Sequence, residues 1–145
     1  MSKREVEFYI VDIFIAIDKI DRYTQNILSA EQLLHNELEW DATTRELEII
    51  GEATNSLLKA DFLDNSYRVV VDFRNQINHG YFGINENIVW DVIKSYLIEF
   101  KEEFIVMIKN KNIVLDEAIA CAKEDNKFSK KTIKLLNALH VEFEK

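Results

Sequence analysis

Apolar residues recur at helical spacing along most of the chain. Near the N-terminus they step alternately by four and three residues, which places them on one face of a long helix. This seam consists of Val6, Ile10, Ile13, Ile17, Ile20, Thr24 and Ile27. Such a helix needs a second apolar surface to pack on, so the pattern predicts a helical bundle rather than an isolated rod.

The same spacing predicts two further helices before the middle of the chain. One runs from about residue 41 to 59, with Asp41 as its N-cap. The next begins at Asn65 or Ser66 and contains the stretch "YRVVVDFRNQIN". Gly80 is expected to end that helix, because glycine readily adopts the left-handed conformation found just past helix ends.

A fourth long helix and two shorter ones complete the prediction. Asn85 or Asn87 caps the fourth helix, and the stretches "LDEAIACAKE" and "SKKTIKLLNALHVEFE" predict the shorter pair. We therefore expect an all-α protein, an antiparallel bundle of four main helices. Residues 1–110 would form this bundle, and residues 111–145 a C-terminal helical extension packed on the same domain.

Composition supports the all-α prediction and limits the possible partners. The 145 residues include no proline and three glycines, which disfavours a turn-rich β architecture. One cysteine and the lack of a run of about 20 uncharged apolar residues predict a cytoplasmic protein with no membrane span. A net charge of −8 argues against broad binding to duplex nucleic acid, but it leaves room for a local basic site on RNA.

The stretch "FRNQINHGYF", residues 73–82, carries the candidate chemistry. Arg74 is a permanent planar cation that can hold a phosphate through two hydrogen bonds. His79 would lie in the last helical turn, where the helix dipole favours the imidazolium and suits a general acid or base. Asn75 and Asn78 could orient His79 or the phosphate. These residues suit cleavage of an RNA phosphodiester by its own 2′-hydroxyl, with no metal or cofactor.

Structural roles are the alternative for the same residues. His79 could bond a helix-end carbonyl, and Tyr81 could pack its ring at the edge of the core with its hydroxyl in water. Arg74 could instead form a structural ion pair. Its candidate partners are Asp72, Glu48 and Glu52. Gly51 and Ala53 favour close helix packing over catalysis.

Arg74, His79 and Tyr81 stand in the order Arg-x4-His-x-Tyr, which resembles the signature of the HepT-like toxins of the HEPN superfamily. The stretch "RELEIIGEA" resembles the second signature of that family, and "VWDVIKSYL" resembles its fourth helix. The likeness covers about residues 4–108, so the tail lies outside it.

The resemblance implies a toxin of a type VII-like toxin–antitoxin pair. It would be a metal-independent endoribonuclease acting on tRNA or mRNA through Arg74 and His79, and would leave a cyclic phosphate. It would form a homodimer in which two such motifs meet. Its partner would be a minimal nucleotidyltransferase antitoxin (MntA) that silences it by AMPylation of Tyr81. The alternatives are a non-catalytic substrate-binding subunit of a nucleotidyltransferase complex and a purely structural helical dimer.

Overall fold

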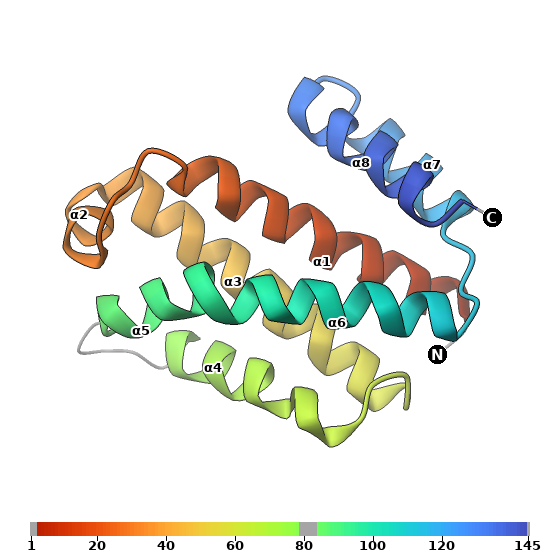
Figure 1. Ribbon diagram of the computed structural model, residues 1–145, viewed down its shortest axis with the longest axis horizontal. Coiled ribbons are helices and arrows are strands. Elements are labelled where there is room, and N and C mark those ends of the chain that lie inside the picture. Colours follow the sequence, from red (N-terminus) through yellow and green to blue (C-terminus); the bar gives the residue numbers. More distant parts are fainter. Residues whose placement is uncertain (1–2, 79–83, 145) are drawn as a thin grey trace.

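The chain folds into an antiparallel bundle of helices, which confirms the predicted all-α class (Figure 1). The computed structural model describes residues 3–78 and 84–144, and no strand occurs among them. The bundle is formed by α1 (Lys3–Thr24), α3 (Glu37–Lys59), α4 (Arg68–Asn78) and a long rod that ends in α6 (Leu97–Asn110). Neighbouring members run in opposite directions (Figure 1).

Shorter elements connect and extend this bundle. They are α2 (Ala30–His35), the 3₁₀ turn η1 (Asn65–Tyr67), α5 (Glu86–Asp91), the π-helical turn η2 (Val92–Tyr96), α7 (Asp116–Asp125) and α8 (Lys130–Glu142). The rod consists of α5, η2 and α6 in succession, and α7 and α8 both pack on α1 (Figure 1). Within the described ranges, no helix is both long enough and apolar enough to cross a bilayer.

The predicted seam of α1 lies in the centre of the core. All seven of its residues are buried, and Ile10 and Ile13 are fully so, although α1 ends at Thr24 and Ile27 lies beyond it. Phe14, next to Ile13, packs against Phe104 of α6 with 5.4 Å between ring centroids. Phe104 in turn stacks on Phe100 at 5.4 Å. Aromatic contacts at this separation add to the burial of apolar area, so this cluster fixes α6 across α1.

Two helix starts differ from the prediction, and one agrees with it. The helix expected to begin at Asp41 begins at Glu37, because Asn36 ends α2 and its N–H bonds the carbonyls of Gln32 and Leu33. The six-residue α2 was missed, since it is too short to show a helical period. Asn85 is confirmed as an N-cap: its side chain accepts from the N–H groups of residues 87 and 88.

The beginning and end of α4 also bear on the prediction. The segment expected to start the helix at Asn65 or Ser66 forms η1, where the Asp64 side chain accepts a hydrogen bond from the Ser66 N–H at 2.8 Å. The α-helix itself starts at Arg68. Gly80, expected to end the helix, lies outside the described residues.

Candidate functional site

Arg74 lies on the inner side of α4, the side that faces α3. Val70 and Ile77, one turn before and about one turn after it, are buried in the same interface. Arg74 itself is half-buried. Its position follows from helical spacing, because residues three and four apart share a face. The cation is therefore attached to an ordered helix by a stem packed inside the bundle.

Gly51 of α3 is the residue that lets Arg74 lie there. A Cβ added at position 51 would overlap the Cβ and Cγ of Arg74, and it would lie 3.5 Å from the Arg74 Cα. Gly51 is buried, so an added methyl group would have to displace packed atoms rather than point into solvent. The glycine of "RELEIIGEA" thus packs directly on the arginine of "FRNQINHGYF". This contact confirms the packing role that was predicted for Gly51.

One N–H group of the Arg74 guanidinium is left unpaired in the described part of the structure. Its Nε is buried and has no hydrogen-bond partner among the described residues. Glu48, one of the three acids considered as structural partners, instead pairs with Arg45 at 3.2 Å. In the part of the chain that the structure describes, no ion pair joins Arg74 to Asp72, Glu48 or Glu52. A buried guanidinium N–H without a partner is costly, which favours a site that an anionic group completes.

The structure describes only some of the other predicted site residues. Asn75 is exposed on the outer side of α4, while Arg74 faces inward. Asn78 is the last residue of α4, and its side chain is not among those described. His79 and Tyr81 lie outside the described residues. The structure thus brings Arg74 together with the second signature, and the roles of His79 and Tyr81 stay predictions.

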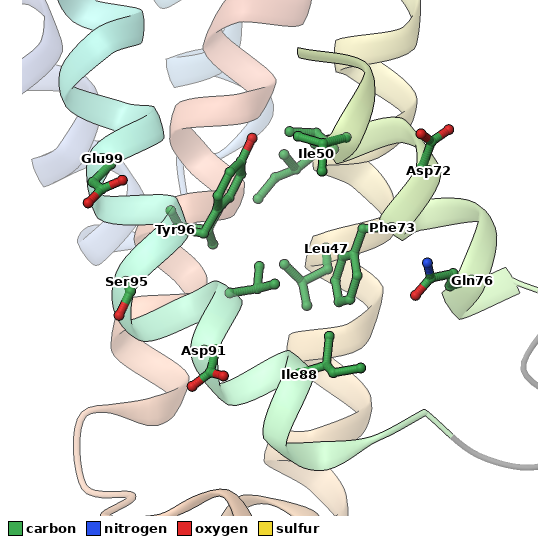
Figure 2. Close-up of a pocket in the computed structure, with 14 residues that line it drawn as sticks. Leu47, Ile50, Asp72, Phe73, Gln76, Ile88, Asp91, Ser95, Tyr96 and Glu99 are labelled. Atoms are coloured by element: carbon green, nitrogen blue, oxygen red, sulfur yellow. The ribbon is translucent and has the colours of Figure 1, made fainter. Parts of the chain in front are cut away.

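An apolar groove of about 740 Å³ lies between α4 and the rod, with Leu47 and Ile50 of α3 also lining it, and it was not predicted from the sequence. Leu47, Phe73 and Ile88 point into it between α4 and the rod that begins with α5 (Figure 2). Val69 and Ile88 at its edge are 52% and 46% exposed. The one sequence signal was the run Val69–Val71, which has more apolar residues than one face of a helix can bury.

The π-helical turn η2 shapes the other wall of this groove. The sequence spacing predicted an unbroken helix, whereas residues 92–96 form a wider turn that shifts the face presented by the following residues. Val92, Ser95 and Tyr96 line the groove (Figure 2). Burial, with smaller contributions from Glu103 and Tyr67, raises the pKa of Tyr96.

Acidic groups flank the groove, and no metal centre accompanies it. Asp72, Asp91 and Glu99 line its edges and are exposed. In the part of the chain that the structure describes, no group of three or more His, Cys, Asp or Glu side chains could hold a metal ion.

Comparison with known proteins finds a matching family model and several relatives. The family model "Ribonuclease HepT-like" matches residues 13–107. The chain is 31% identical over 106 residues to "Putative RNase MJ1380" of Methanocaldococcus jannaschii, covering 71% of this chain and 96% of that protein. It is 30% identical over 105 residues to "Probable ribonuclease HepT" of Thermococcus cleftensis, covering 70% and 94%. No solved structure matches the chain.

The Gly51 contact generates a prediction about the sign of a stability change. Glycine to alanine inside a helix ordinarily stabilises a protein, by about 0.5–1 kcal/mol. Gly51→Ala should instead lower the free energy of unfolding by about 1–3 kcal/mol, because the new methyl group overpacks against Arg74. Urea denaturation would measure this change in the free energy of unfolding. Glu52→Ala, exposed on the same helix, should change stability by less than about 0.5 kcal/mol. A Gly51→Ala protein as stable as wild type would contradict the close contact.

Proposed function

Since this chain belongs to the Ribonuclease HepT-like family, we propose that it is the ribonuclease toxin of a toxin–antitoxin pair and that it cuts RNA with Arg74 and His79. The observation that carries the proposal is the state of Arg74. Its stem is fixed against Gly51, and its buried Nε has no partner in the described structure. An RNA phosphate would supply the anionic acceptor that this guanidinium lacks.

In the proposed reaction, a ribose 2′-oxygen attacks the adjacent phosphorus while His79 accepts the hydroxyl proton. Arg74 stabilises the negative charge that grows on the phosphorane oxygens. The bond from phosphorus to the 5′-oxygen then breaks, and that oxygen takes up a proton. The products are a 2′,3′-cyclic phosphate and a free 5′-hydroxyl. Asn75 and Asn78 are proposed as supporting residues that help to orient the phosphate or His79.

Arg74→Ala and His79→Ala should each lower RNA cleavage by about 10²–10⁴-fold, because one removes charge stabilisation and the other proton transfer. The assay is incubation of each purified protein with total RNA in EDTA, followed by mapping of product ends. Arg68→Ala, which removes an exposed arginine from the first turn of the same helix, is the matched control and should cut like wild type.

Three results would decide against this proposal. Equal cleavage by all variants would point to a contaminating nuclease. Metal-dependent cleavage by wild type would contradict the mechanism. Intact RNA after incubation with unmodified wild type, combined with stable binding to a nucleotidyltransferase, would favour the alternative of a non-catalytic substrate-binding subunit.

We further propose that two copies of the chain associate through the groove beside α4. Val69 and Ile88, at its edge, belong to the helices that precede and follow the motif, so association there would bring two motifs together. Two copies of Arg74 and His79 would also concentrate positive charge in an otherwise acidic protein. Partly exposed apolar side chains gathered around one groove are typical of an interaction surface.

Val69→Glu should convert this dimer into a monomer, because it places a charge in the proposed interface. Light scattering coupled to size exclusion would measure the molar mass. Val106→Glu is the matched control, since Val106 is similarly exposed, at 56%, and lies on α6 outside the groove. A monomeric wild type, or a Val69→Glu protein that remains a dimer, would rule this interface out.

The proposed control of the toxin is AMPylation of Tyr81 by a nucleotidyltransferase antitoxin. AMPylation would attach a bulky, negatively charged phosphodiester to Tyr81, which is close to Arg74 in the sequence. This group would compete with the RNA phosphate for Arg74. Coexpression with the partner should add one adenylyl group to wild type and none to Tyr81→Phe, as measured by intact mass. Modification of Tyr81→Phe at another residue would remove Tyr81 from this role.

The family match suggests how the chain is divided. We propose that residues 1–110 form the HepT-like unit, since the matched residues 13–107 fall within it. Residues 111–145 would then be an extension whose helices α7 and α8 pack on α1. The cytoplasmic location expected from the sequence stays a prediction.

A further inference from the structure

The turn between α7 and α8 exposes an aromatic side chain that the bundle does not use. Phe128 is 92% exposed. The Nζ of its neighbour Lys127 lies 5.5 Å from the centroid of its ring. This turn lies outside the residues matched by the ribonuclease family, so the proposed nuclease site gives it no role.

The exposure of Phe128 is imposed by an ordered turn. The Asn126 side chain donates to the Ala122 carbonyl at 2.8 Å, and the Ser129 N–H donates to the Asn126 carbonyl at 2.8 Å. Arg22 of α1 then donates to the hydroxyl of Thr132, which is fully buried, at 3.2 Å. These bonds close the turn and fasten the start of α8 to α1. Phe128 therefore projects from a fixed base.

Positive charge is concentrated around this ring. The whole chain has 18 Lys and Arg against 26 Asp and Glu, yet residues 123–134 contain five lysines and two acids. One of those acids, Glu124, is paired with Lys127 at 3.2 Å. Lys130, Lys131 and Lys134 are exposed on the first turns of α8. An acidic protein thus presents a local basic surface with an aromatic ring in it.

A hollow of about 650 Å³, lined by both polar and apolar side chains, adjoins this surface through Arg22. It lies between the end of α1, α2 and the start of α3. Its lining residues are Arg22, Tyr23, Asn26, Ile27, Gln32, Asn36, Leu38, Glu39 and Ala42. Amide and hydroxyl groups of this kind can bond base edges or ribose hydroxyls. The hollow leads from Arg22 toward α2, which packs on α5, the helix that follows the proposed catalytic motif.

We propose that Phe128 and the surrounding lysines form an anchor for single-stranded RNA. An unpaired base would stack on the Phe128 ring while Lys127, Lys130 and Lys131 contact the flanking phosphates. Duplex RNA is a poorer fit, because its bases are already stacked and cannot reach the ring. The inference rests on the proposed ribonuclease function, and it adds a substrate class: RNA with an unpaired segment that extends beyond the cleavage point.

The test measures binding rather than cleavage. The probe is a fluorescein-labelled 2′-O-methyl oligouridylate, which lacks the attacking hydroxyl and cannot be cut by the proposed mechanism. Phe128→Ala should bind it about fivefold or more weakly than wild type. Phe128→Trp should retain binding, and its added tryptophan fluorescence should be quenched when a base stacks on it. Lys130→Glu combined with Lys131→Glu should reduce the salt dependence of binding by about 1.4 in log–log slope.

Matched controls separate this site from general surface effects. Val106→Ala removes an apolar side chain that is 56% exposed on α6, and Lys59→Glu reverses an exposed charge at the end of α3. Both should bind the probe like wild type. Unchanged binding by Phe128→Ala, or no quenching of Phe128→Trp, would overturn the proposal. Capture of phosphatidylserine vesicles in place of RNA would also overturn it, because it would assign the surface to anionic lipid.

The outcome of this binding test can be distinguished from the outcome of the RNA cleavage test. Weaker binding by Phe128→Ala together with no RNA cleavage by wild type would keep the anchor and remove the ribonuclease assignment. Normal cleavage by wild type together with unchanged binding by Phe128→Ala would keep the ribonuclease assignment and remove the anchor. Arg68→Ala should bind the probe as wild type does, since the anchor lies on α7 and α8 and Arg68 is an exposed residue of α4.

Discussion

The close approach of α3 and α4 at Gly51 is the constraint on which the candidate site depends. A side chain at position 51 would occupy the space that the Cβ and Cγ of Arg74 fill. The glycine therefore fixes both the separation of the two helices and the direction in which the arginine leaves the bundle. Since packed interiors yield little to an added methyl group, a cation held in this way is positioned before any ligand arrives.

One short helix, α4, takes part in both features. Val70 and Ile77 are buried, and Arg74 lies between them in the sequence with its stem against Gly51. Val70 and Phe73 also line the apolar groove, and residues of the π-helical turn η2 line its other wall. Under the proposed function, association at the groove and the chemistry of Arg74 would therefore be linked through this one helix.

Charge is distributed unevenly over the chain. The family match ends at residue 107, and the lysine-rich turn around Phe128 lies well beyond it. The hydrogen bond from Arg22 to Thr132 attaches that turn to α1, within the matched region. An overall negative charge disfavours indiscriminate binding to nucleic acid, and a local basic surface can still hold one strand. The extension would thus add RNA contacts without altering the bundle.

The sequence by itself determined the all-α class, the buried face of α1 and the family, and it narrowed the cap of the fourth helix to Asn85 or Asn87. These features are set by local spacing and by residue order. It did not determine α2, the π-helical turn η2 or the groove beside α4, and it left open whether Arg74 pairs with a carboxylate. Only the tertiary structure decided these, because the contact of Gly51 with Arg74 and the exposure of Phe128 depend on where distant helices pack. Periodicity reports which face is apolar, not which neighbour covers it.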